Sequence, residues 1–271
     1  MARETEAVMF RLIWQELKFR KNAIIGWGLG LGFLPVVYVG IYPQVADQMA
    51  GFADLEFYKA MGMSLGTFSD WVGSILVIML PLVASIFSVI NGTGTLAGEE
   101  EDGRLEMIVT LPLPRWKIVS AKAIALSLST FIIYLIVALA STFVFKSIEN
   151  QIVTDMAGMD LFYAVIFSWP LVFAMAMISM FLAAFCANRR VAGVISATLL
   201  IISYFGSNLA ASTSAIKPFE PFFLFTYLDA SSKAVMEGQQ FGDVMVLLGI
   251  GLVSFILTLV FFERRNLTVG A

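Results

Sequence analysis

The sequence contains no histidine and a single cysteine, Cys186. Without histidine the chain cannot form a Ser–His catalytic pair, and most zinc sites are excluded with it. One cysteine cannot form a disulfide within the chain. Two common routes to enzymatic function are therefore closed.

Charged residues are also scarce, because Asp, Glu, Lys and Arg make up 14% of the 271 residues whereas 59% are hydrophobic. Soluble domains have about 25% charged residues, so an ordinary water-soluble fold is excluded. The 24 phenylalanines exclude a disordered chain. A net charge of −3 offers no concentrated basic surface for nucleic acid. The composition predicts a polytopic membrane protein.

Six apolar stretches are long enough to cross a bilayer, for which a helix needs about 20 mostly apolar residues. None of them contains Asp, Glu, Lys or Arg. They predict an all-α fold with six transmembrane helices in one membrane domain, residues 1–271. The predicted spans run from Ala23 to Tyr42, Trp71 to Ile90, Ile124 to Phe145, Leu161 to Ala187, Val191 to Leu209 and Val244 to Phe262.

The basic residues predict the orientation of these spans. Thirteen of the 17 Lys and Arg residues lie before the first span, between the second and third, between the fourth and fifth, or after the sixth. Cytoplasmic loops carry the excess of Lys and Arg. We therefore expect both termini to be cytoplasmic, in the cytoplasmic (inner) membrane.

Residues 1–21 have the pattern of an amphipathic helix. Such a helix can lie on lipid headgroups, and the same surface could bind a cytoplasmic partner. Its apolar face contains Phe10, Ile13, Trp14 and Leu17, and its polar face contains Arg11, Gln15, Glu16 and Lys18.

The connection between the second and third spans, residues 92–120, is the most informative segment. It has four consecutive acids, Glu99, Glu100, Glu101 and Asp102, next to a membrane surface whose potential disfavours them. A short helix with Leu105 and Ile108 on its apolar face follows, and Pro112 favours its end at Leu111. The charge pattern alone leaves two interpretations open, a docking helix for a protein partner and a solvated acidic loop.

The residues of this segment resemble a family signature. The run Gly98-Glu-Glu-Glu-Asp-Gly-Arg-Leu-Glu, then Leu111-Pro112, Arg115 and Lys122, is similar to that of ABC transporter permeases of the type-2 export family. Arg104 stands where that family usually has Thr. Phe262-Glu-Arg-Arg-Asn-Leu near the C-terminus resembles the closing motif of the family, and Lys217-Pro-Phe resembles a third, external motif.

The resemblance implies a six-helix permease half that pairs with a second copy or a close relative and with two cytoplasmic ABC ATPase subunits. It also implies that the helix after the acids docks on the ATPase. The residues then expected to couple to the ATPase are Glu99, Glu100, Glu101, Asp102, Gly103, Arg104, Leu105, Ile108, Leu111, Pro112 and Arg115.

The sequence supports this division of labour, because it contains no Gly-x-x-x-x-Gly-Lys-[Ser/Thr] motif and hence no phosphate-binding loop of that type. We expect ATP and Mg²⁺ to bind in the partner ATPase, and no cofactor, metal or nucleic acid to bind this chain. Asn91-Gly-Thr-Gly-Thr95 lacks the lysine of that motif and is expected to let the second helix end and bend.

Two further groups of residues suggest packing or a pathway. Gly26, Gly28, Gly30 and Gly32 form two interleaved Gly-x-x-x-Gly pairs, which favour close packing within the subunit or at a dimer seam. In the fifth span, Ser203, Tyr204, Ser207 and Asn208 either bond to neighbouring backbone or line a translocation path. The Phe-rich external loop, residues 210–243, is expected to contain re-entrant or interface-lying segments.

Two other functions remain open at this point. A secondary carrier or facilitator is one, although ion-coupled carriers usually place an ionisable residue inside the bilayer and these spans contain none. A membrane scaffold that recruits a cytoplasmic protein is the other. We favour the permease of an ABC exporter, a membrane subunit without enzymatic activity of its own.

Overall fold

The computed structural model describes residues 2–52, 67–101, 114–154, 156–186 and 188–264, and these residues form helices and connecting loops without a strand. The α-helices are α1 (Ala2–Phe52), α3 (Phe68–Val72), α4 (Leu80–Thr93), α5 (Glu99–Glu101), α7 (Arg115–Ile148), α8 (Gly158–Cys186), α9 (Arg189–Ser212), α10 (Ser232–Glu237) and α11 (Phe241–Arg264). Two π-helical segments, η1 (Gly73–Met79) and η2 (Gly94–Gly98), and three 3₁₀ segments, η3 (Glu149–Gln151), η4 (Lys217–Phe222) and η5 (Leu224–Tyr227), complete the list.

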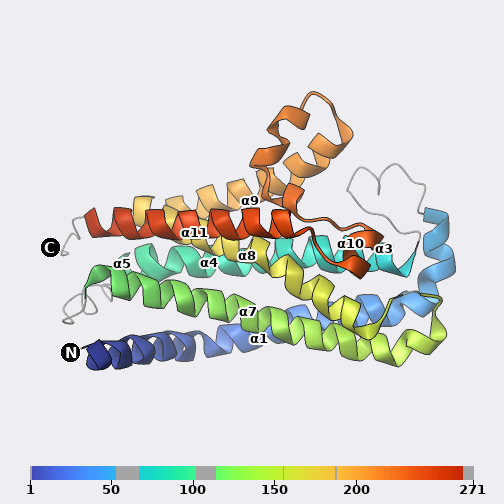
Figure 1. Cartoon of the computed structure of the whole chain (residues 1–271), viewed down its shortest axis with the longest axis horizontal. Coiled ribbons are helices and arrows are strands. Elements are labelled where there is room, and N and C mark those ends of the chain that lie inside the picture. The colour runs from blue at the N-terminus through green and yellow to red at the C-terminus, as the bar shows by residue number, and fades with distance from the viewer. Residues whose placement is uncertain (1, 53–66, 102–113, 155, 187, 265–271) are drawn as a thin grey trace.

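Among the described residues, six helical stretches are long and apolar enough to cross a membrane. Five of the predicted spans lie within one of them, and the fourth does so up to Cys186, since its last residue, Ala187, lies outside the described residues. The all-α, six-span prediction is thereby confirmed. The long helices run along a common axis, with the start of α1 and the end of α11 at the same end of the bundle (Figure 1). We call this the terminal end, and we call the end with α3 and α10 the distal end.

Helix α8 lies at the centre of the bundle, where it contacts α4, α7, α9 and α11. Its residues Leu171, Val172, Met175 and Ala176 have no exposed surface. Polar contacts between helices supplement this packing, since Trp169 donates a hydrogen bond to the Thr130 hydroxyl across 3.0 Å. Such contacts stabilise membrane bundles, in which burial from water contributes little between helices.

Helix α1 contains both the predicted amphipathic segment, from Ala2 onward, and the first span. It runs without interruption through the first span, because no Gly or Pro interrupts the chain between the amphipathic segment and Ala23. Phe10 and Trp14 are exposed, in keeping with an outward apolar face. Glu16 and Arg20, in contrast, are buried against the rest of the protein.

The second span also continues beyond the expected end. Its helix passes through the glycine-rich segment as the π-helical turn η2 and continues into α5, as far as the described residues reach. The hydroxyls of Thr93 and Thr95 donate to the carbonyls of Val89 and Asn91, four residues earlier, which keeps this wider turn hydrogen-bonded. The preceding π segment, η1, accommodates Pro81, whose ring would clash with the carbonyl four residues before it in a regular α-helix.

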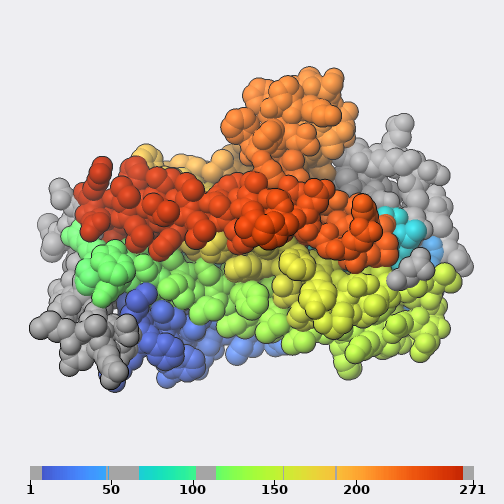
Figure 2. All heavy atoms as spheres, viewed as in Figure 1, coloured from blue at the N-terminus to red at the C-terminus, as the bar shows by residue number. Residues whose placement is uncertain are grey.

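The segment after α9 folds back as η4 and η5 and forms a protrusion on the side of the bundle (Figures 1 and 2). Its attachment depends on Gly206 of α9, because a Cβ atom there would lie 2.4 Å from the ring of Phe223. Ser203 of α9 accepts hydrogen bonds from the backbone N–H groups of Leu224 and Phe225 at 2.6 and 3.3 Å. These contacts position the protrusion above the end of α9.

Candidate functional sites at the two ends of the bundle

The segment predicted to dock on the ATPase, which we call the docking segment, runs from Glu99 to Pro112, and described helices flank it on both sides. Glu99, Glu100 and Glu101 form α5, and Arg115 begins α7. The other residues predicted to couple to an ATPase lie outside the described residues: Asp102, Gly103, Arg104, Leu105, Ile108, Leu111 and Pro112.

A buried group of charges joins the helices on both sides of this segment. Lys122 of α7 lies 2.5 Å from Glu16 of α1 and 2.6 Å from Glu99 of α5. Arg20 of α1 lies 3.4 Å from Glu16 and donates a hydrogen bond to the Thr95 hydroxyl across 2.9 Å. We call these five residues the ionic cluster.

The ionic cluster balances two carboxylates against two cations in a region with little access to water. The Lys122 side chain has no exposed surface, and those of Glu16 and Arg20 are each 9% exposed. Removing one partner of a buried ion pair typically costs about 3–5 kcal/mol, because the other charge stays buried without compensation. The ionic cluster therefore ties α1, α5 and α7 together.

The first turn of α9 joins the same end of the bundle. The backbone N–H of Arg189 donates a hydrogen bond to Glu101 across 2.9 Å. The Arg189 side chain lies over η2, where Cβ atoms at Gly94 and Gly98 would come within 3.5 and 3.1 Å of it. The turn between the fourth and fifth spans thus contacts the acidic helix α5.

The four glycines of the first span divide into two pairs. Cβ atoms at Gly28 and Gly32 would lie 2.7 and 3.6 Å from Ile136 of α7, so this pair lies in the contact between α1 and α7. Where a Cβ would be placed on Gly26 or Gly30, no atom of the described residues beyond the adjoining backbone of α1 lies within 4 Å. They line an open groove of about 490 Å³ together with Trp27.

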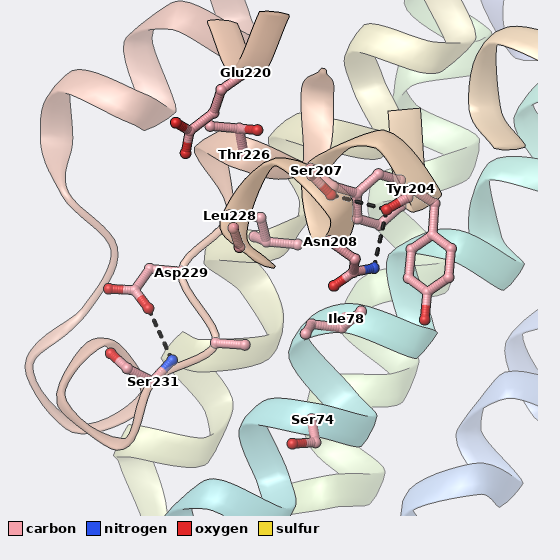
Figure 3. A pocket seen from close by; sticks show the side chains of 13 residues that line it. Ser74, Ile78, Tyr204, Ser207, Asn208, Glu220, Thr226, Leu228, Asp229 and Ser231 are labelled. Carbon is pink, nitrogen blue, oxygen red and sulfur yellow. Dashed lines mark hydrogen bonds between the residues drawn. The ribbon is translucent and has the colours of Figure 1, made fainter. Parts of the chain in front are cut away.

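A cavity of about 350 Å³ lies toward the distal end, between η1, α9 and the protrusion (Figure 3). Of the residues predicted to line a pathway, Tyr204, Ser207 and Asn208 do line this cavity. Ser203 does not, because its hydroxyl accepts the backbone hydrogen bonds of η5. The remaining lining residues are Ser74, Ile78, Ala211, Glu220, Phe225, Thr226, Leu228, Asp229, Ala230 and Ser231.

The polar side chains of α9 are partly engaged with their own helix. Ser207 and Asn208 both donate to the Tyr204 carbonyl, at 2.9 Å each, as the dashed lines in Figure 3 show. Ser196 similarly donates to the Ala192 carbonyl. Ser207 and Asn208 therefore form hydrogen bonds within α9 and also line the cavity.

A comparison with protein-family models matches residues 12–267 to the ABC-2 family transporter protein. The match covers nearly the whole chain, including all six membrane helices and both sites described above. The chain belongs to the ABC-2 transporter family. A comparison with curated proteins finds no match.

Membership of the ABC-2 family makes the protein a multi-pass membrane permease of an ABC transporter. Permeases of this family are transport components, generally not catalytic, and in general imply an ABC ATPase partner. The family resemblance read from residues 98–122 is thereby confirmed.

Sequence reasoning missed most of the ionic cluster. The helical pattern predicts Glu16 on the polar face of the amphipathic segment, and Arg20 contributes only to the predicted orientation. The available signal was Lys122, a cation between two alanines at the start of a long apolar helix. A charge in that position needs a buried counter-charge, although the sequence does not identify which one.

Proposed function

We propose that the protein is the permease half of an ABC exporter, which pairs with a second copy of itself or a close relative and binds two cytoplasmic ATPase subunits. ATP and Mg²⁺ bind in the ATPases, and the spans of the two permeases form the pathway. The groove at Gly26 and Gly30 supports the pairing, because small residues let helices of two subunits approach closely.

The ATPase docks on the segment that begins with α5, at Glu99, and continues to Pro112. The observation that supports this assignment is the ionic cluster, which joins α5, at the start of this segment, to α7, the described helix that follows it in the sequence. Because breaking a buried ion pair is costly, the ionic cluster holds α1, α5 and α7 together when the docking segment is displaced. Glu101 extends the connection to α9 through its contact with Arg189.

Closure of the ATPases on binding ATP moves the docking segment, and the ionic cluster passes this movement to α1 and α7. The spans then switch access between the two membrane faces, as a two-state equilibrium that nucleotide biases. The excess of Lys and Arg in the N- and C-terminal segments and in the connections after the second and fourth spans supports a cytoplasmic position for both termini, with the protein in the inner membrane. The family resemblance supports outward transport.

The decisive experiment combines the permease with an ABC ATPase chain in lipid nanodiscs. Because the chain has one cysteine, a Cys186→Ser background allows a single new cysteine at Leu105 to be tested for crosslinking to the ATPase. A cysteine at Lys217, in η4, is the matched control.

We expect co-purification, stimulated ATP hydrolysis and crosslinking from position 105 alone. Retention of the ATPase without stimulated hydrolysis would instead favour a scaffold. Substrate transport that needs no ATPase would favour a carrier.

A further inference from the structure

The protrusion after α9 carries two large aromatic side chains that no described part of the chain covers. Phe219 is 59% exposed and Phe222 is 81% exposed, although both lie outside the six membrane helices. They belong to η4, a 3₁₀ segment, in which side chains three positions apart lie one above the other. The two phenylalanines therefore share one face of η4, whereas Lys217 and Glu220, also three positions apart, share another.

Contacts on both sides of η4 fix the direction of this aromatic face. The ring of Phe223, the next residue in the chain, packs on Gly206 of α9, where a Cβ atom would lie 2.4 Å from it. The Tyr227 hydroxyl donates a hydrogen bond to the Pro221 carbonyl across 2.8 Å and so ties η5 to η4. The protrusion thus packs one phenylalanine against the bundle while it holds the two others outward.

The protrusion begins where a membrane span ends. The 24 residues of α9 correspond to about 36 Å of helix, slightly more than the hydrocarbon layer of about 30 Å. Arg189 and Arg190 are exposed at its start, in keeping with a position at one membrane surface, so its last residue, Ser212, lies close to the opposite surface. From there the protrusion stands out sideways from the bundle (Figures 1 and 2). It therefore lies beside the spans, close to the level of the membrane surface.

The lipid-facing side of α9 adjoins the protrusion. Ile202 and Leu209, one helical turn before and after Gly206, are both exposed apolar residues within this span. Exposed apolar side chains of a membrane helix contact acyl chains, so the protrusion is attached next to a surface that is already in contact with lipid. Helix α1, which carries the groove assigned to the second copy, lies on the other side of the bundle (Figure 1).

We propose that the aromatic face of η4 binds phospholipid in the membrane leaflet on the distal side. The rings of Phe219 and Phe222 lie in the interfacial layer, where aromatic residues of membrane proteins gather, and Lys217 on the other face points to headgroups and water. Because η4 is fixed to α9, this contact sets the height of α9 in the bilayer. The proposal requires only that the six helices span a membrane, so it is independent of the ATPase and of pairing.

The test measures the depth of spin labels on η4 for the permease alone in nanodiscs. In a Cys186→Ser background, a nitroxide is attached to a single cysteine in Phe219→Cys or Phe222→Cys. Power saturation compares its collisions with oxygen, which concentrates in hydrocarbon, and with a water-soluble nickel chelate. We expect oxygen to prevail at both positions, as at the reference Leu209→Cys on α9. Lys217→Cys, in the same 3₁₀ segment but on its other face, is the matched control, and the nickel chelate should prevail there.

Preference for the nickel chelate at either phenylalanine position would show that the face lies in water, and it overturns the proposal. Weak collision with both reagents would place the rings against protein and overturns it equally, with dipolar broadening between labels identifying a second copy of the chain. Since no ATPase is present, neither result bears on ATPase docking or stimulated hydrolysis, by which the proposed function is judged.

Discussion

At the scale of single residues, the chain keeps its charges out of the predicted spans and concentrates the buried ones at the terminal end. Lys122 has no exposed surface, and within the described residues its charge is compensated by Glu16 and Glu99. These two carboxylates come from helices far apart in the sequence. The lysine thus acts as the contact through which α1 and α5 are held on α7.

Replacing Lys122 with methionine should destabilise the protein by about 3–5 kcal/mol, since two carboxylates would stay buried with only Arg20 nearby. Thermal unfolding in nanodiscs measures the loss. Lys117→Met, on the same helix but partly exposed, is the matched control and should change the melting temperature little. Equal losses in the two variants would mean that the ionic cluster contributes nothing specific.

Replacing a glycine of α1 with leucine should have different effects on stability in the two glycine pairs. Gly28→Leu should destabilise the permease by about 1–3 kcal/mol, because its side chain would displace Ile136 of α7. Gly26→Leu meets open space and should leave the melting temperature of the protomer unchanged. If the groove is a dimer seam, Gly26→Leu should lower the mass measured by light scattering; an unchanged mass would place the seam elsewhere.

At the scale of elements, the second span shows how far the sequence can be interpreted. Its apolar run predicts a helix, because hydrophobic length is a local property. The glycines before α5 suggested an end to that helix, whereas the Thr93 and Thr95 hydroxyls and the contact with Arg189 sustain a π-helical turn. Contacts of this kind depend on residues distant in the chain, so the sequence alone does not reveal them.

Helix α5 should govern attachment of the ATPase. Reversing its charge with Glu100→Lys/Glu101→Lys should reduce retention of the ATPase about tenfold or more, or uncouple its hydrolysis from transport, since charges at an interface set both orientation and affinity. Pull-down and hydrolysis assays on the assembled complex measure this. Glu237→Lys, at the distal end, serves as the control. If the double variant assembles with the ATPase and couples hydrolysis to transport as the unmodified protein does, α5 is not part of the surface that binds the ATPase.

At the scale of the whole molecule, the number of spans and the fold class were predictable, because each span is an uncharged run of sufficient length. The cavity was predictable only in part. Tyr204, Ser207 and Asn208 stood out as polar groups in one span, but Glu220 and Asp229 reach the same cavity by the folding back of η4 and η5. That return depends on Gly206 and Ser203, whose roles appear only once their partners are placed.

The orientation of the molecule can be tested with cysteine labelling in the Cys186→Ser background. Lys217→Cys, exposed in η4, should react with a membrane-impermeant maleimide in intact cells. Arg190→Cys, exposed at the start of α9, should react only after the membrane is permeabilised. The reverse pattern would invert the assignment made from the Lys and Arg distribution.

The uninterrupted course of α1 has a mechanical consequence. Its 51 residues correspond to about 75 Å of helix, more than twice the thickness of the hydrocarbon layer, although its last turns bend away from the bundle axis at the distal end (Figure 1). Glu16 near one end lies in the ionic cluster, and near the other end the Tyr38 carbonyl accepts a hydrogen bond from Trp71. If the end of α1 that carries Glu16 is tilted, the opposite end of the helix moves in the reverse direction. Bending at Pro35 or Pro43 would reduce this movement. One helix can thus convey force across the bilayer without a relay of side chains.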